Sequence, residues 1–142
     1  MANETLSERL ALVATIDPQL VDNATVTSDW VPMAQLRRVL FTLLLGATDT
    51  TVNAKLQRAS DNTGSDAEDV SGKAITQLGA SADNRQAQLE MSAAEMGTFG
   101  YVRLSVTVSD GTSGAQVAAV GIGTDARYAP ARTLRLSSVA EG

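Results

Sequence analysis

The stretch that decides the fold is YVRLSVTVS, residues 101–109 of a chain of 142 residues. Apolar and polar side chains alternate through it without a break, so Val102, Leu104, Val106 and Val108 fall on one face. A period of two residues is typical of a strand that is buried on one face and meets water on the other. The stretch therefore predicts a half-buried antiparallel β-strand.

Most of the chain on either side divides into similar stretches, separated by turn-forming residues. About eight strands at spacings of roughly ten residues are typical of sandwiches and jelly rolls. We therefore predict an all-β fold, an antiparallel β-sandwich or jelly roll with extended N- and C-terminal arms. The predicted strands are residues 24–33, 36–45, 50–57, 73–78, 86–91, 99–109 and 115–122, followed by a weaker one over 134–139.

Four local patterns refine this prediction. The run 36–45 is almost continuously apolar, which favours a strand buried on both faces. Residues 60–71 are rich in turn formers and predict an exposed loop. Residues 93–96 suggest a single helical turn that stops at Gly97. The sequence DGTSG at 110–114 favours a hairpin whose return strand places Val117 and Val120 in the core.

The domain organisation is one sandwich with an arm at each end. Residues 1–18 are expected to form an N-terminal arm, residues 19–125 the sandwich, and residues 126–142 a C-terminal arm. Residues 5–16 show both helical and strand spacing of apolar side chains, so either element is open there. The dipeptide Asp17-Pro18 ends whichever of the two forms.

Composition excludes several functional classes. The chain has no cysteine and no histidine, so it lacks thiolate chemistry, the commonest general base and the commonest transition-metal ligand. A net charge of −5 argues against direct nucleic-acid binding. The start has no basic region before an apolar core, and the longest apolar stretch is too short to cross a membrane. We therefore expect a soluble, non-enzymatic protein without a signal peptide, made in the cytoplasm.

Two features invite a binding site, and each has a simpler reading. The acidic segment with Asp61, Asp66, Glu68 and Asp69 offers oxygen ligands for calcium, but its spacing does not match an EF-hand. A solvated loop is the favoured interpretation, with no metal and no cofactor. Trp30 could stack on a carbohydrate, but no aromatic cluster accompanies it, so a core or interface role is favoured.

Several segments resemble a family of small virion structural proteins of tailed bacteriophages. They are residues 25–31 (TVTSDWV), the apolar strand that leads into 46–52 (GATDTTV), 83–86 (DNRQ) and 101–108 (YVRLSVTV). The resemblance extends from Thr25 to about Ile122. It implies a β-sandwich or jelly roll that binds the outside of a capsid or sits at the neck, and it carries no catalytic motif.

The resemblance implies a capsid decoration or cement protein on the virion surface. Its partners would be the major capsid protein and copies of itself, with a trimer suggested by the threefold positions of capsids. A neck or tail component and a carbohydrate- or receptor-binding module are the alternatives. The side chains expected to contact partners are Leu6, Leu10, Leu12, Ile16, Trp30, Arg127, Arg132 and Arg135.

Overall fold

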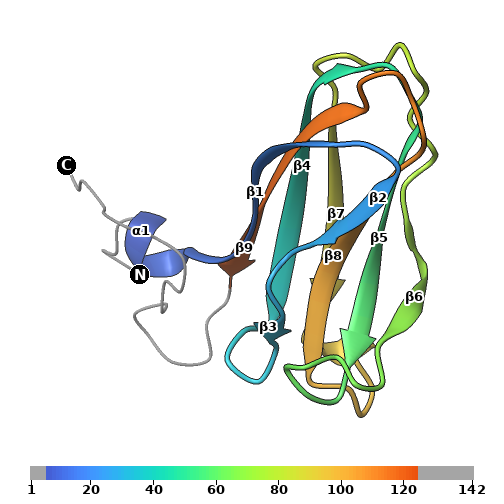
Figure 1. The fold of residues 1–142 in the computed structure, drawn as a ribbon. Helices are drawn as coiled ribbons and strands as arrows, with labels where there is room; N and C mark the ends of the chain where they lie inside the picture. Colours follow the sequence, from blue (N-terminus) through green and yellow to red (C-terminus); the bar gives the residue numbers. More distant parts are fainter. Residues whose placement is uncertain (1–5, 125–142) are drawn as a thin grey trace.

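Two antiparallel sheets pack face to face in the computed structural model, which describes residues 6–124 apart from the side chains of residues 7 and 8 (Figure 1). The all-β sandwich prediction is confirmed. Sheet A contains, in spatial order, β1 (Ala11–Val21), β9 (Ala115–Thr124), β4 (Arg38–Thr48) and β7 (Gln86–Ser92). Sheet B contains β2 (Ala24–Thr27), β8 (Tyr101–Val108), β5 (Val52–Ala59) and β6 (Glu68–Ala74), and β3 (Val31–Pro32) also pairs with β8.

The core lies between the inner faces of the two sheets. As the alternation in 101–109 predicts, Val102, Leu104, Val106 and Val108 of β8 are all at most 1% exposed. β8 pairs along its full length with β5, which places Leu104 beside Leu56 in sheet B. From sheet A, the core receives Val39, Phe41, Leu43, Leu45, Leu89, Met91 and Val117.

Strand β9 turns a different face to the core from the one expected. Ala115, Val117 and Ala119 are buried, whereas Val120 and Ile122 lie on the outer face, so the prediction of Val120 in the core is wrong. The inner positions near the end of β9 are Gly121 and Gly123. A Cβ on Gly121 would lie 2.9 Å from Phe41 Cε1, so large side chains from neighbouring segments fill this part of the core instead.

The turn at residues 110–114 is not a hairpin. β8 pairs with β2, β3 and β5, whereas β9 pairs with β1 and β4, so the turn carries the chain from sheet B to sheet A. Asp49 Oδ2 accepts a hydrogen bond from the backbone N–H of Ser113 at 2.7 Å, and Asp49 Oδ1 accepts one from Gly114 at 3.0 Å. Asp22 accepts one from Gly111. The prediction of a turn at residues 110–114 is correct, but the turn residues do not determine which strands pair.

The N-terminal segment is mostly part of the sandwich. α1 is a single helical turn, Leu6–Arg9, and β1 begins at Ala11, so residues 5–16 use both of the elements left open. Ile16 is 3% exposed in the core, which corrects its assignment to an arm outside the sandwich. The physical reason is that β1 pairs with β9 from Ala11 to Val21, with register shifts after Leu12 and after Ile16, and therefore carries a buried inner face. The prediction that Asp17-Pro18 ends the element is wrong, because β1 continues through this dipeptide at the second shift.

Other boundaries also differ from the sequence prediction. The expected strand 24–33 is divided into β2 and β3, because Ser28 Oγ accepts a hydrogen bond from the Leu104 backbone N–H at the break. β6 occupies Glu68–Ala74, partly inside the expected loop and ahead of the expected strand 73–78. The helical turn at 93–96 is confirmed as the 3₁₀ turn η1 (Ala93–Glu95). No helix among residues 6–124 is long and apolar enough to cross a membrane.

Replacing Leu104, the leucine of β8, tests this core. We expect Leu104→Ala to lower the free energy of unfolding by about 2–5 kcal/mol, because Leu104 is fully buried and the surrounding strands close a cavity only in part. Chemical denaturation monitored by circular dichroism measures the loss. The matched control is Leu6→Ala at a site that is 71% exposed, where we expect a change within about 0.5 kcal/mol. Equal effects of the two substitutions would contradict the assignment of the core.

Candidate functional site

The outer face of sheet B carries a stacked pair of side chains. Arg103 projects from β8, and its guanidinium carbon lies 4.3 Å from the centre of the Trp30 ring. Arg103 Nε donates a hydrogen bond to Gln57 Oε1 on β5 at 2.9 Å, which fixes the guanidinium over the ring. Burial lowers the pKa of Arg103 from its ordinary value, although a guanidinium stays protonated at neutral pH. The pair is therefore a rigid cation–π contact.

A loop from β5 to β6 closes against the same tryptophan. Gly64 in this loop has a φ of +72°, and a Cβ built there would lie 2.7 Å from Trp30 Cζ2. The Trp30 ring, half-buried overall, thus contacts Arg103 and the Gly64 backbone. This arrangement supports the packing role that the sequence favoured, because a carbohydrate platform needs an aromatic face open to water.

Asp61 organises the loop through hydrogen bonds. Asp61 Oδ1 accepts from the backbone N–H groups of Thr63, Gly64 and Ser65 at 3.0, 2.8 and 3.3 Å, and its oxygens also accept from the Thr63 and Ser65 hydroxyls. The Ser65 and Thr63 hydroxyls, followed by the backbone donors, hold the pKa of Asp61 well below its usual range. The ionised carboxylate is therefore a structural part of the loop.

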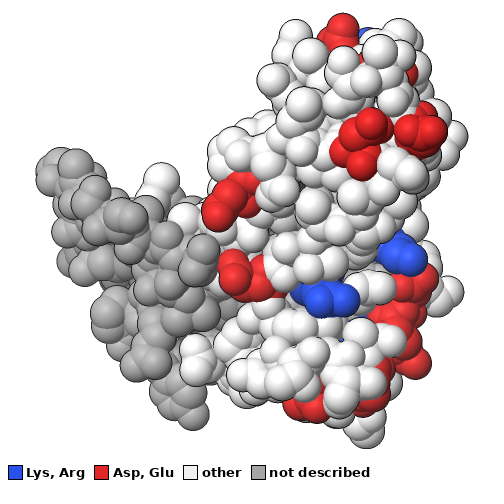
Figure 2. Space-filling view, viewed as in Figure 1, with Lys and Arg blue, Asp and Glu red and all other residues white. Residues whose placement is uncertain are grey.

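The other acidic side chains of this segment also have partners on the protein. The Ser60 hydroxyl and backbone lower the pKa of Asp66, and Lys55 followed by Gln57 lowers the pKa of Asp69. Glu68 forms an ion pair with Arg58 at 2.8 Å. Among residues 6–124, no three acidic side chains converge as they would around a metal ion. Figure 2 shows acidic side chains gathered along the side where β6 runs, with a few basic ones beside them.

The outer face of sheet A has a different chemistry, because it is aliphatic along its two central strands. We define the aliphatic face as the central outward side chains of β4 and β9, which are Leu40, Thr42, Leu44, Ala118, Val120 and Ile122. None of these six is charged. Arg38, Gln116 and Thr124 point outward from the same strands nearer their ends. Residues 36–45 were expected to be buried on both faces, but only the inner face of β4 is buried, and Leu44 is 45% exposed. The apolar composition of this strand therefore reflects an outer face that is half-buried, with Leu44 the exposed member of the six.

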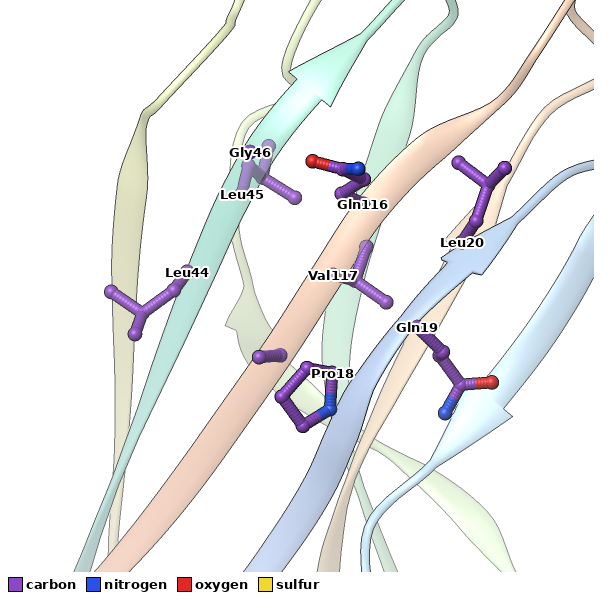
Figure 3. A pocket seen from close by; sticks show the side chains of 9 residues that line it. Pro18, Gln19, Leu20, Leu44, Leu45, Gly46, Gln116 and Val117 are labelled. Carbon is purple, nitrogen blue, oxygen red and sulfur yellow. The ribbon is translucent and has the colours of Figure 1, made fainter.

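A shallow hollow of about 450 Å³ opens at one end of the aliphatic face (Figure 3). Pro18 and Leu20 on β1 stand at one side of β9, and Leu44 on β4 stands at the other. Ala118 on β9 lies between them and makes the floor low, whereas the Gln116 side chain lies against Gly46 at the end of the hollow. Leu20 is 61% exposed, so the walls of the hollow present apolar side chains to solvent.

The structure brings together only part of the predicted contact set. Leu6 is exposed in α1, Leu10 and Leu12 are half-buried, and Ile16 lies in the core. Trp30 sits on the opposite sheet from these residues. Arg127, Arg132, Arg135 and the predicted C-terminal arm lie outside the described residues.

Sequence reasoning missed Leu20, Leu44 and Ala118 as surface residues. The available indication was the apolar run 36–45 itself, because a strand that is apolar on both sides needs a cover on each side. The register that brings Ala118 next to Leu44 could not be derived from the spacing of residues in a single strand.

Two glycine substitutions test the contact between the loop and Trp30. Gly64 and Gly72 both have a positive φ, but only Gly64 has atoms within 4 Å of an added Cβ. We expect Gly72→Ala to show the backbone strain alone, roughly 1–2 kcal/mol, and Gly64→Ala to destabilise the protein more. Only Gly64→Ala should change the fluorescence of Trp30, the one tryptophan in the chain. An unchanged emission spectrum in Gly64→Ala would contradict the packing.

A pH series tests the role of Asp61. Because its folded pKa lies below the unfolded value of about 3.9, the carboxylate contributes stability that is complete above the unfolded pKa and is lost as pH falls through the folded pKa. We therefore expect the stability difference between the wild type and Asp61→Asn to be constant from pH 7 to about pH 5 and to narrow below about pH 4. Urea unfolding across this range measures it. A difference that widens on acidification would contradict the hydrogen-bond assignment.

Comparisons with known proteins support the fold and do not show a family. No family model matches the sequence, and no curated protein matches it significantly. The structure of infectious bursal disease virus, Gt strain, gives a TM-score of 0.51 at 10% identity, over 86% of this chain and 34% of that one. The cellulose-binding domain of Cellulomonas fimi β-1,4-glucanase C gives a TM-score of 0.45 at 12% identity, over 83% of this chain and 90% of that one. The SPBc2 prophage-derived protein YomS gives a TM-score of 0.43 at 9% identity, over 80% of this chain and 93% of that one. All three likenesses are distant, and only the one to the virus structure exceeds a TM-score of 0.5, which shows a shared fold and no family.

Proposed function

We propose that this protein is a virion structural protein of a tailed bacteriophage, which binds the outside of the capsid as a decoration or cement protein. The observation that carries the proposal is the aliphatic face of sheet A, a broad apolar surface on a rigid sandwich. Such a surface suits a protein that works by association. The resemblance of residues 25–31, 46–52, 83–86 and 101–108 to phage virion proteins, at the capsid or at the neck, supports the choice of a virion over other assemblies.

The mechanism that we propose is the bridging of neighbouring capsid subunits. A protein that contacts two or more subunits adds contacts that must all break before a subunit detaches, and linked contacts strengthen one another through effective concentration. The sandwich supplies stiffness, because its core side chains are fully buried between two sheets. The major capsid protein is the proposed partner, with contacts through Leu6, Leu10 and Leu12 and through the basic residues of 126–142.

The carbohydrate-binding alternative receives less support from the geometry. Its strongest candidate residue was Trp30, and the ring of Trp30 stacks under Arg103 and against Gly64. A neck or tail position requires the same kind of rigid sandwich, so it is distinguished by location on the particle and not by the fold.

The proposal is tested on particles with and without this protein. We expect particles that carry it to release their DNA at a higher temperature, measured by dye access to DNA during heating. The arginines of 126–142 should contribute through attraction to an acidic capsid surface, so raised salt should weaken binding. We therefore expect Arg132→Ala/Arg135→Ala to bind capsids more weakly in cosedimentation and to show less salt dependence than the wild type.

The matched control removes the same charge elsewhere. Arg37→Ala/Arg85→Ala changes two arginines of the described body, and we expect it to bind capsids with nearly wild-type affinity. Particles that open at the same temperature with and without the protein would refute the cement role. Gold-labelled protein found only at the neck or tail would assign it to the alternative position.

A further inference from the structure

We propose that the aliphatic face of sheet A is the interface of a two-fold dimer, in which β4 of each copy packs over β9 of the other. This inference concerns the contact between copies, and it stands whether or not the protein binds a capsid. It rests on the register of β4 and β9, on the shape of the hollow beside Leu44, and on the charge of the face.

The register pairs the outward side chains of the two strands row by row. Leu40 lies directly across from Ile122, Thr42 from Val120, and Leu44 from Ala118. Consider an axis above the face that runs parallel to the strands, midway between β4 and β9. A half-turn about such an axis places β4 of a second copy over β9 of the first, with every row in the same position along the strand. Leu44 of each copy then lies over Ala118 of the other.

The shapes of these side chains fit that placement. Leu44 is an exposed large side chain, and Ala118 is a small one in the floor of the hollow that Pro18 and Leu20 border on the far side. The same face therefore carries both a projection and a recess, as a self-complementary interface requires. Sheets that stack face to face keep their strands within about 30° of each other, which keeps the rows near the axis in register.

Charge at the centre of the face does not oppose a second copy as the occupant. The protein carries a net charge of −5, so an acidic surface meeting its own copy would be repelled. The six residues of the aliphatic face have no ionisable side chain. Two charged side chains lie beside them: Arg38 points outward from β4 across from Thr124, and Glu90 lies next to Leu40 on β7. The half-turn places Arg38 over Thr124 of the partner and Glu90 over its Leu12. At the margin, the half-turn brings Gln88 of β7 over the β1 side of the partner, where Thr15 occupies the same row. The rim is thus polar and uncharged in this row.

The size of the face predicts a reversible dimer. The contact extends over all four strands of sheet A, because β7 of each copy lies over β1 of the other. Four strands about 4.8 Å apart and six residues at about 3.4 Å each give roughly 400 Å² in plan. Side-chain relief raises the buried area to about 800–1,200 Å² over both copies, below the roughly 1,600 Å² of a standard interface. Pairing through one face joins two copies, so it differs from the trimer that capsid symmetry suggested.

The test uses the full-length chain and a pair of opposite charges. Leu44→Glu and Ala118→Lys each place a charge in the proposed contact, and we expect either variant alone to associate at least about tenfold more weakly than the wild type. When the two variants are mixed in equal amounts, the carboxylate introduced in one copy meets the ammonium group introduced in the other at one of the two symmetric contacts. The second contact keeps the native Leu44 and Ala118. We therefore expect the mixture to recover the dimer.

Sedimentation velocity over about 1 to 1,000 μM, the range of weak interfaces, measures the mass. Thr25→Glu, on the outer face of sheet B beside Thr107, is the control and should dimerise like the wild type. Circular dichroism and thermal unfolding check that each variant is folded. Capsid cosedimentation of Leu44→Glu is a separate measurement, so loss of the dimer is distinguished from loss of capsid binding.

Three results would overturn the inference. The first is a wild type that stays monomeric at every concentration. If the monomeric wild type is also more stable than Leu44→Glu, the face is covered by a segment of the same chain. The second is a Leu44→Glu variant that dimerises like the wild type. The third is an equimolar mixture that stays monomeric, since a two-fold contact between Leu44 and Ala118 requires rescue.

Discussion

The structure depends on the burial of the inward face of β8 against sheet A. Val102, Leu104, Val106 and Val108 alternate with polar residues, and this period fixes which side of sheet B meets water. A slip of one residue would turn all four side chains outward, so the register with β5 is specified along eight paired positions. Burying each large aliphatic side chain contributes roughly 1.5–3 kcal/mol, which makes this face the main source of stability.

The two outer faces of the sandwich have opposite characters. On sheet B, polar side chains satisfy one another: Arg103 stacks on Trp30, Lys55 pairs with Asp69 at 2.8 Å, and Asp61 holds the adjoining loop. On sheet A, β4 and β9 present aliphatic side chains outward, with Leu44 exposed. A sandwich whose polar side chains are paired on the outer face of one sheet, and whose other sheet is apolar outside, presents one surface for association. The proposed roles in the virion and between copies both start from this asymmetry.

Local patterns predicted the strands well and their partners poorly. The alternation at 101–108 and the helical turn at 93–95 depend on neighbouring residues, so the sequence alone was sufficient for both. The turn at 110–114 was expected to close a hairpin, but its path between the sheets depends on Asp49, more than 60 residues earlier. Val120 was placed inside because it is apolar, whereas Phe41 already fills the space that faces Gly121. Leu44 was likewise expected inside because it is apolar, whereas it lies on the outer face.

The central claim is that the aliphatic face of sheet A becomes covered when the protein works. Hydroxyl-radical footprinting, read by mass spectrometry, compares the oxidation of Leu44 and Leu20 in dilute protein with that in the assembled form, the concentrated dimer. Leu20 and Leu44 are 61% and 45% exposed in the monomer, so both are reactive there. The account predicts strong protection of Leu44 and Leu20 on assembly, with Tyr101 on sheet B unchanged. Undiminished oxidation of Leu44 in the assembled form would contradict it.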